Sequence, residues 1–319
     1  MRISFRSLSV VFFLSLFFLS TSSFAAEKRQ FVETVQFQNG QSAEITVVAF
    51  DNEEASSKVA LQRAFSAMTR LDTELGEYEN NTLWKLNHAG KKTSVSLSPE
   101  AFSLLKQAVN LSKVTDGWFD IAAPSAYSAF SQRDYRRIKL NENTSSLSFT
   151  KSKMKLDLSW ILKAGMVDAA IASLQQSGFA NAQVEYAGVS RHIGNDIYTP
   201  WSITLGQGKE KEFAYHANQY KLSSAAVTHI DQANAGNLID AKNKKVVVPQ
   251  IKNAFVIANS AVNATAFAVA AYSLEPLTSI RYINKHPAVH GFVTDLEGNL
   301  LTSESFAEKI KKQLYTENK

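Results

Sequence analysis

The sequence predicts an α+β fold, a single domain in which mixed sheets pack against helices. Segments with strand periodicity and segments with helix periodicity are both present, and they do not alternate strictly along the chain. The 319 residues, 45% of them hydrophobic, would suffice for one large domain or two small ones. Because no linker-like stretch, composition break or internal repeat divides them, we expect one domain over residues 26–319.

The first predicted elements are a hairpin and a long helix. Residues 29–50 hold two stretches in which apolar and polar residues alternate, FVETVQF and AEITVVAF, which is typical of paired strands. Residues 52–76 place apolar side chains on one helix face, begin with acidic residues and stop at Gly76.

The middle of the chain predicts two more helices. Ser98 is a suitable N-cap and Pro99 suits the first helical position, so a helix is expected over residues 98–117. In LDLSWILKAGMVDAA, the alternation at residues 156–158 predicts a strand end, and a helix is expected over residues 161–177. Lys163 would then lie in the first helical turn, where a cation opposes the helix dipole.

The remaining segments alternate between strands and one helix. Strands are expected from residue 183 to 217, with the G-x-G of TLGQGKEK as a hairpin turn, because no helix follows it as a phosphate-binding loop requires. A helix is expected over residues 258–273, and short strands over 279–284 and 290–295.

The first 25 residues resemble a secretory signal peptide. Arg2 and Arg6 precede an apolar run from Val10 to Leu19, and Ser23-Phe24-Ala25 is a small-x-small cleavage site. The run is shorter than the ~20 residues of a membrane span. We expect cleavage near Ala25 and, in a Gram-negative host, a periplasmic protein with no membrane span after the signal is removed; an uncleaved anchor is the alternative.

Composition excludes several classes of protein. There is no Cys, so the chain has no disulfide, no thiol nucleophile and no N-terminal Cys to carry a lipid. The formal charge of +5 falls to +3 without the two leader arginines, and the short basic stretches lack interleaved aromatic residues, so no nucleic-acid surface is expected. His286 and His290 have a metal-like spacing, but Pro287 lies between them, and we expect packing roles.

Six stretches, taken in order, resemble the ApbE family. They are GEYENNTLWKLNHAG, TDGWFDIAAPSAY, the segment from KLDLSWILKAG to SRHIG, YKLSSAAV, GNLIDAKNKKVV and VIANSAVNATAFAVAAYSL. The resemblance covers roughly residues 30–300. It implies a T-fold-related ApbE-like domain and the activity of an exported FAD:protein FMN transferase. Such an enzyme uses FAD and Mg²⁺ to attach FMN to a Thr of an acceptor flavoprotein, with release of AMP.

The resemblance also implies which residues contact the flavin nucleotide. The positions are Trp118, Phe119, Asp120, Asp157, Lys163, Ser223, Ser224 and Ile239. A Lys beside an anionic nucleotide would explain its unfavourable place in the helix, because the N–H groups of that helix end also favour anions. The alternative is that Lys163 pairs only with Asp157 or Asp168.

Several family positions have changed their chemistry in this chain. The catalytic positions are Asn237, where the family has a His suited to general-base work, and Asp240, which is kept. Asn cannot take a proton at neutral pH, and a general base typically contributes ~10²–10⁴ in rate. The alternative is a shift of the loop that brings in His229, which is eight positions earlier.

The metal positions are also altered. They are Trp160, Thr265, Ala268 and Val269; Thr265 replaces a carboxylate and Val269 replaces a hydroxyl. Because Mg²⁺ prefers hard anionic oxygen ligands, we expect weak magnesium binding. Trp160 stands where the family has a small residue, and it would either fill the space of the metal and pyrophosphate or stack on a ligand ring.

Three function hypotheses follow. The first is an active FAD:protein FMN transferase with altered ligands. The second is a periplasmic protein of the same fold that binds flavin or a partner protein without transfer. The third is an unrelated module that binds a small anion. Metal-dependent FAD binding and mass gain of an acceptor protein distinguish the first two.

Overall fold

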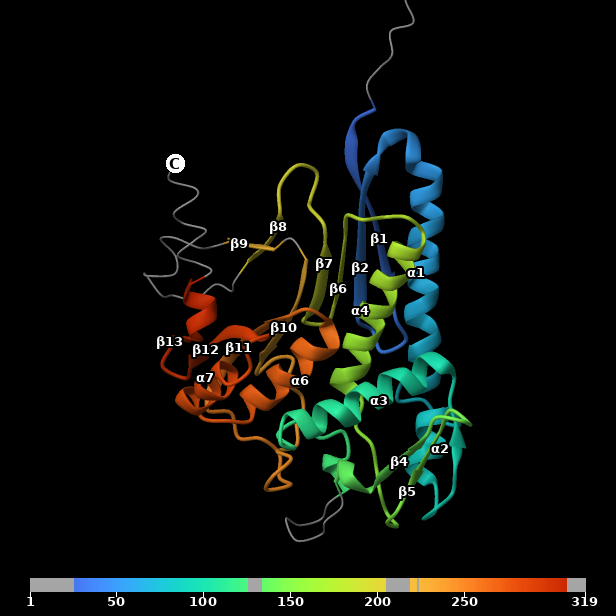
Figure 1. The fold of residues 1–319 in the computed structure, drawn as a ribbon, viewed down its shortest axis with the longest axis vertical. Helices are drawn as coiled ribbons and strands as arrows, with labels where there is room; N and C mark the ends of the chain where they lie inside the picture. The colour runs from blue at the N-terminus through green and yellow to red at the C-terminus, as the bar shows by residue number, and fades with distance from the viewer. Residues whose placement is uncertain (1–25, 126–133, 205–218, 223, 309–319) are drawn as a thin grey trace, which may run out of the picture.

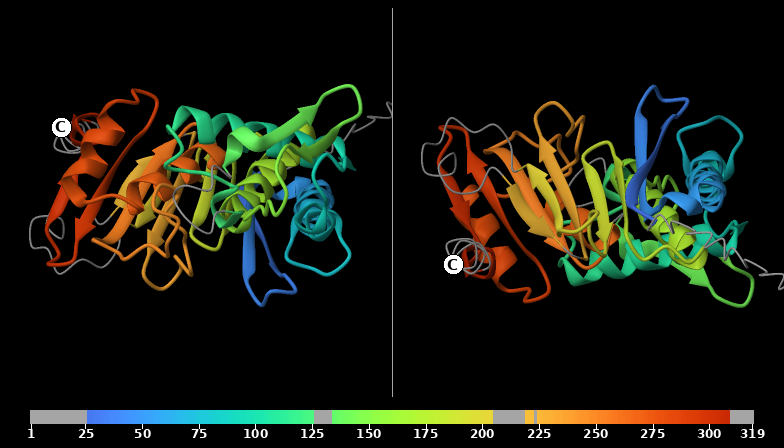
Figure 2. Two further views of the ribbon diagram at one scale, coloured as in Figure 1. Left: turned by 90° about the horizontal axis from the view of Figure 1, so that it is seen from below. Right: turned by 90° about the horizontal axis from the view of Figure 1, so that it is seen from above.

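The centre of the fold is one eight-stranded sheet (Figure 1). The computed structural model describes residues 26–125, 134–204, 219–222 and 224–308. In spatial order the strands are β1 (Lys28–Gln36), β2 (Ser42–Phe50), β6 (Ala182–Tyr186), β7 (Val189–Ile193), β10 (Ala225–Asp231), β11 (Ile251–Ala258), β12 (His290–Asp295) and β13 (Leu300–Thr302). Figure 2 shows this succession from the blue hairpin at one end to the red strands at the other.

The helices pack along the sheet in the order of the strands they cover. The helices are α1 (Glu54–Leu75), α2 (Thr82–His88), α3 (Pro99–Val114), α4 (Ser159–Gln176), α6 (Ala261–Tyr272) and α7 (Pro276–Asn284). Helix α1 contacts β1 and β2, α4 contacts β6 and β7, α6 contacts β10 and β11, and α7 contacts β12. Helix α3 packs on α4 and α6. The first turn of α4 is therefore held between α1, α3 and α6.

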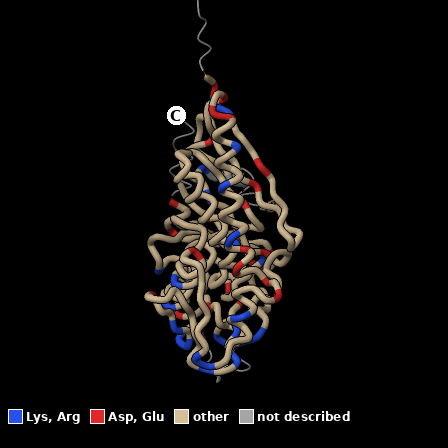
Figure 3. The backbone as a smooth tube through the Cα atoms, turned by 90° about the vertical axis from the view of Figure 1, so that its right-hand side faces the viewer, with Lys and Arg blue, Asp and Glu red and all other residues tan. Residues whose placement is uncertain are grey.

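Two smaller sheets complete the described fold. Strands β3 (Val95–Ser96), β5 (Ser146–Phe149) and β4 (Ile138–Asn141) form one, and β8 (Trp201–Thr204) with β9 (Gln219–Leu222) forms the other. Single 3₁₀ turns occur at Asp51–Glu53, Ala123–Ser125 and Tyr135–Arg137. The three-stranded sheet and α2 lie at the lower end of the molecule, where Figure 3 shows Lys and Arg gathered. Positive charge is thus concentrated at one end.

The predicted α+β class is confirmed, with one refinement. Every pairing between the named strands is antiparallel, so the sheets expected to be mixed are antiparallel. The predicted hairpin and the helices at 52–76 and 98–117 are present, and Ser98 caps α3 by accepting a hydrogen bond from the Ala101 N–H. The G-x-G turn and the strands expected over 205–217 lie outside the described residues.

Two expected strands are wrong. Residues 279–284 belong to α7, because Pro276 starts a helix whose buried residues Ser279, Tyr282 and Ile283 have helical spacing. Residues 156–158 form no strand. The backbone of Leu156 instead makes both its hydrogen bonds with the side chain of Asn87.

Helix α6 is the most buried helix of the site. Eleven of its twelve residues are buried, and Ser260 caps it by accepting a hydrogen bond from the Asn263 N–H. A helix that is apolar on all sides must be enclosed on all sides, which agrees with its contacts to the sheet, α3, α4 and α7. No helix in the described part of the chain has the combined length and hydropathy of a membrane span.

Candidate functional site

The candidate site is built around the first turn of α4. The segment before it is fixed by Asn87 on α2, whose amide brackets Leu156 with bonds of 3.0 and 2.7 Å. The Asp157 N–H donates to the Ile121 carbonyl at 2.8 Å, and the Asp157 carboxylate accepts from the Ser159 N–H at 2.9 Å. The helix begins at Ser159, so Lys163 lies in its second turn and not in the first.

The stretch TDGWFD forms the facing wall. Thr115 ends α3, and its hydroxyl accepts from the Phe119 N–H at 3.2 Å. Asp116 and Gly117 both have positive φ (50° and 73°), which turns the chain sharply and brings Trp118 and Phe119 back toward α4. The sequence motif is therefore a tight turn that positions two aromatic side chains.

Asp120 at the end of this turn is buried and fully engaged. Its carboxylate accepts from the N–H groups of Ala122 (2.8 Å) and Tyr135 (3.1 Å), and the Lys244 Nζ lies 3.7 Å away. Burial raises the pKa of Asp120, while those two N–H groups and Lys244 act to lower it. This carboxylate ties the segment between α3 and β4 to the loop after β10.

Seven of the predicted site residues line one small space, here called the inner hollow. They are Trp118, Phe119, Asp120, Asp157, Trp160, Ile239 and Val269. Its volume is about 30 Å³. A space of that size holds about one water molecule and no organic ligand.

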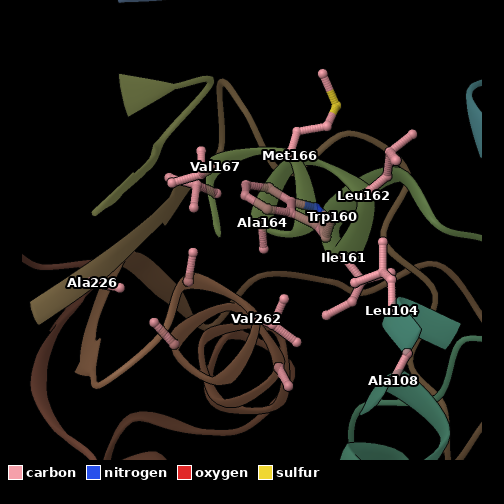
Figure 4. Close-up of a cluster of buried hydrophobic side chains, with 14 of the residues drawn as sticks. Leu104, Ala108, Trp160, Ile161, Leu162, Ala164, Met166, Val167, Ala226 and Val262 are labelled. Atoms are coloured by element: carbon pink, nitrogen blue, oxygen red, sulfur yellow. The ribbon is translucent and has the colours of Figure 1, made fainter. Parts of the chain in front are cut away.

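Trp160 accounts for the small size of the inner hollow. Only 5% of this residue is exposed, and its indole is packed in the main hydrophobic core with Ala164 and Val167 of α4 and Val262 of α6 (Figure 4). Because a Trp side chain is the largest available, a smaller residue here would leave open space between α4 and α6.

Lys163 faces a second space, here called the outer cavity, of about 320 Å³. Its lining includes polar side chains of the β1–β2 turn and of the end of α1, among them Asn39, Asp72 and Tyr78. The Lys163 Nζ lies 4.5 Å from the centre of the Trp160 ring, a cation–π contact. Burial lowers the pKa of Lys163, and the charges of Asp157 and Glu77 act in the opposite direction.

The polar groups of the outer cavity are partly paired with each other. The Tyr78 hydroxyl donates to the buried Asp72 carboxylate at 2.7 Å, and burial together with this carboxylate raises the pKa of Tyr78. The Asn39 amide donates to the Tyr186 hydroxyl at 2.9 Å. The cavity thus offers two phenol rings, two side-chain amides, two carboxylates and a single Lys.

Three of the four predicted metal positions, Thr265, Ala268 and Val269, lie together on α6, and the fourth, Trp160, is on α4. The Thr265 hydroxyl is 2.8 Å from that of Thr228 on β10, and both residues are fully buried. Ala268 and Val269 are buried and apolar. Within the described ranges, no group of three or more His, Asp or Glu side chains is placed to hold a metal ion.

The predicted catalytic residues do not enter either space. Asn237 is exposed, and Asp240 holds its own turn by accepting from the N–H groups of Lys242 and Asn243. His229 is on β10 next to Thr228 and so points to the opposite face of the sheet, where it stacks on Phe255 at 4.1 Å. A loop shift therefore does not bring His229 to the site.

The remaining predicted positions are peripheral or undescribed. Ser224 is exposed, and its hydroxyl accepts a long hydrogen bond of 3.4 Å from the Gly194 N–H. Ser223 lies outside the described residues. The His286 ring contacts Phe267 and Tyr282 and its Nδ1 lies 2.9 Å from the Tyr282 carbonyl oxygen.

Sequence reasoning missed the interaction that positions α4. The Asp168 carboxylate binds Arg191 of β7 at 2.6 Å and accepts from the first two N–H groups of α6, at Ala261 and Val262, both at 3.0 Å. Lys163 is therefore not its partner. The sequence signal is that Asp168 is the one acidic residue of α4, which identifies neither contact.

A larger open hollow of about 690 Å³ lies between α1 and α4, away from these residues. It is lined by side chains such as Arg70, Glu74 and Gln176, and by none of the predicted site residues. If volume were the only criterion, this hollow would be chosen as the ligand site. The two spaces at the start of α4 are lined by predicted site residues.

Comparisons with known proteins agree on the family. A sequence model of the ApbE family matches residues 40–293. An ApbE protein from Thermotoga maritima has a similar structure, with a TM-score of 0.74, 20% identity, and coverage of 88% of this chain and 99% of that one. The flavin transferase ApbE from Vibrio cholerae has a TM-score of 0.71, 16% identity, and coverage of 88% and 99%.

A third solved structure is similar to the same extent. The apo form of the flavinyl transferase ApbE from Pseudomonas stutzeri has a TM-score of 0.74, 15% identity, and coverage of 89% of this chain and 98% of that one. No curated protein sequence matches significantly. Because the family match extends over most of the chain and includes every motif at the start of α4, this protein belongs to the ApbE family.

Proposed function

We propose that this protein is a flavin-transferase-like member of the ApbE family that binds a flavin nucleotide beside Lys163 and does not carry out metal-dependent FMN transfer. The observation that carries the proposal is the buried Trp160, which fills the space between α4 and α6 and leaves about 30 Å³ there. Membership of the ApbE family supports a flavin nucleotide as the ligand. The side chains at the site support binding of that ligand without transfer of FMN.

The residues present do not fit a magnesium ion. A magnesium site needs oxygen ligands in near-octahedral geometry, usually with carboxylates. The Thr265 hydroxyl is engaged with Thr228, and Val269 has no oxygen in its side chain. The nearby carboxylate of Asp120 is held by two N–H groups and Lys244. We therefore derive no step through a metal.

In the described part of the chain, neither candidate base is placed to act on an acceptor hydroxyl beside Lys163. Asn237 stands at the family's His position and cannot accept a proton at neutral pH. His229 points away on the other face of the sheet. The described site therefore lacks both the base and the metal ligands that would assist attack on a phosphoryl group.

An active FAD:protein FMN transferase is the second candidate, and the family match favours it. In that case FAD would be the substrate, an acceptor flavoprotein would be the partner, and ligands other than the family ones would hold Mg²⁺. We further propose that residues 1–25 are a signal peptide, that residues 26–319 form the domain, and that the protein is exported to the periplasm without a lipid, since it has no Cys.

Calorimetric titration with FAD and with FMN, each in MgCl₂ and in EDTA, tests the proposal. We expect flavin binding whose dissociation constant is the same in both buffers. Binding that requires magnesium would contradict the proposal, and so would the absence of binding by either nucleotide.

A transfer assay separates the two candidates directly. The protein is incubated with FAD, MgCl₂ and a flavoprotein that carries an acceptor Thr, and the acceptor is weighed by mass spectrometry. The Vibrio cholerae flavin transferase is the positive control. We expect FMN addition in the control alone; addition by this protein would establish the active transferase.

A further inference from the structure

We propose that Trp160 determines the size of the ligand, so that the outer cavity accepts a mononucleotide, with one ring system and one phosphate, in preference to the dinucleotide FAD. This inference rests on the proposed binding of a nucleotide beside Lys163. It goes beyond that function by assigning the class of ligand and the residue that selects it.

The two spaces at the start of α4 are neighbours separated by its first turn. Ser159 lines both the inner hollow and the outer cavity. Trp160 lines the inner hollow, and Lys163, whose Nζ lies over the Trp160 ring, lines the outer cavity. The contact between the Trp160 indole and the Lys163 Nζ therefore lies between the two spaces.

The volumes set the size of the ligand. Small-molecule sites commonly occupy about 300–1,000 Å³. The outer cavity, at about 320 Å³, is at the lower end of that range, and the inner hollow, at about 30 Å³, adds room for only a water molecule. A second nucleotide half has no enclosed space to occupy while Trp160 keeps its position.

The charges agree with the volumes. Lys163 is the one cationic side chain among the residues that line the outer cavity, and Glu77 and Asp72 are acidic. Lys163 can pair with one phosphate group, and Glu77 and Asp72 disfavour a second phosphate next to it. The Tyr78 and Tyr186 rings and the apolar Leu75 and Met166 provide walls for a single planar ring.

Equilibrium titration of the protein with FMN, AMP, riboflavin and FAD measures the preference. We expect FMN, AMP or both to bind at least tenfold more tightly than FAD, and riboflavin to bind more weakly than FMN because it has no phosphate for Lys163. Equal affinity for FMN and FAD would overturn the inference and leave the proposed function intact. Tight binding of AMP alone would support the inference and contradict the flavin function. No binding at all would contradict both.

Trp160→Ala tests this role of the indole, because its removal enlarges the inner hollow on the side where Lys163 contacts the ring. We expect the ratio of FAD to FMN affinity to rise at least tenfold. Trp84→Ala is the matched control, since Trp84 is exposed on α2, stacks on His88 and lines neither space. An unchanged ratio in folded Trp160→Ala would overturn the inference.

Two further variants keep the test decisive if Trp160→Ala does not fold. Trp160→Phe removes part of the ring system and preserves an apolar core residue, and we expect a smaller rise of the same ratio. Lys163→Met keeps the length of the side chain and should abolish the preference for FMN over riboflavin. If Trp160→Phe left the ratio unchanged, or if Lys163→Met kept the preference for FMN over riboflavin, the inference would be wrong.

Discussion

Replacement of Asp168 by Asn should loosen the attachment of α4 to the rest of the fold. The carboxylate makes three short contacts, with Arg191 at 2.6 Å and with two α6 N–H groups at 3.0 Å each. Hydrogen bonds to charged groups contribute about 1.5–3 kcal/mol each when they are lost. The Asp168 and Arg191 side chains are only 18% and 23% exposed, so solvent screens the pair incompletely.

The Asn variant keeps one acceptor oxygen but loses the charge, and it leaves the Arg191 guanidinium without its partner. We therefore expect a loss of about 2–4 kcal/mol in the free energy of unfolding. The lower bound applies if water reaches the guanidinium. The same change should raise the dissociation constant of any ligand beside Lys163, because the first turn of α4 is part of the loosened element.

Urea unfolding followed by circular dichroism measures the effect. Glu54→Gln is the matched control, because Glu54 also contacts two cations, Arg29 at 2.6 Å and Lys58 at 2.7 Å, but lies at the surface. We expect no measurable change there. If Asp168→Asn unfolds within about 0.5 kcal/mol of the unmodified protein, the assigned role of the carboxylate is wrong.

Three other outcomes follow from the structure. Thr265→Val leaves the buried Thr228 hydroxyl without its partner and should lower the free energy of unfolding by about 1–3 kcal/mol. The double variant with Thr228→Val should lose less than the sum of the two single changes, as measured by a double-mutant cycle in urea. Burial lowers the pKa of His192 to about 4, so the folded protein should lose about 3 kcal/mol of stability as the pH falls from 6.5 to 4. His192→Gln should abolish this loss. If the stability of the variant depended on pH as that of the unmodified protein does, the prediction would be wrong. Removal of divalent ions with EDTA should leave the thermal midpoint unchanged, and a drop that magnesium reverses would indicate a metal site.

Local signals in the sequence predicted the helices well. The cap and proline at Ser98 and Pro99 placed the start of α3, and the apolar face and Gly76 placed the extent of α1. The wrong predictions fall on short segments, where the apolar pattern is too short to distinguish a helix from a strand. The nine residues of α7 contain β-branched and aromatic residues that favour a strand, and only packing of the buried Tyr282 and Ile283 decides for a helix.

The site was predicted in part for a similar reason. Motif resemblance named seven of the twelve residues that line the inner hollow, because each motif is a contiguous stretch of sequence. The bond between Asp168 and Arg191 joins elements 23 positions apart, and its geometry depends on the packing of α4 against β7. The position of Trp160 between two spaces likewise depends on the distance between helices, which no sequence pattern gives.

The enclosure of α6 has a consequence for how the reaction of such a fold can be lost. Positions 265 and 269 lie on a helix whose every turn is needed to fill the interior, so substitutions there must preserve shape even when a ligand is no longer required. Exchange of Asp for Thr, or of Thr for Val, changes polarity with little change in volume. A scaffold of this kind can therefore lose an ion site without any movement of its helices, and the fold alone does not show whether the chemistry persists.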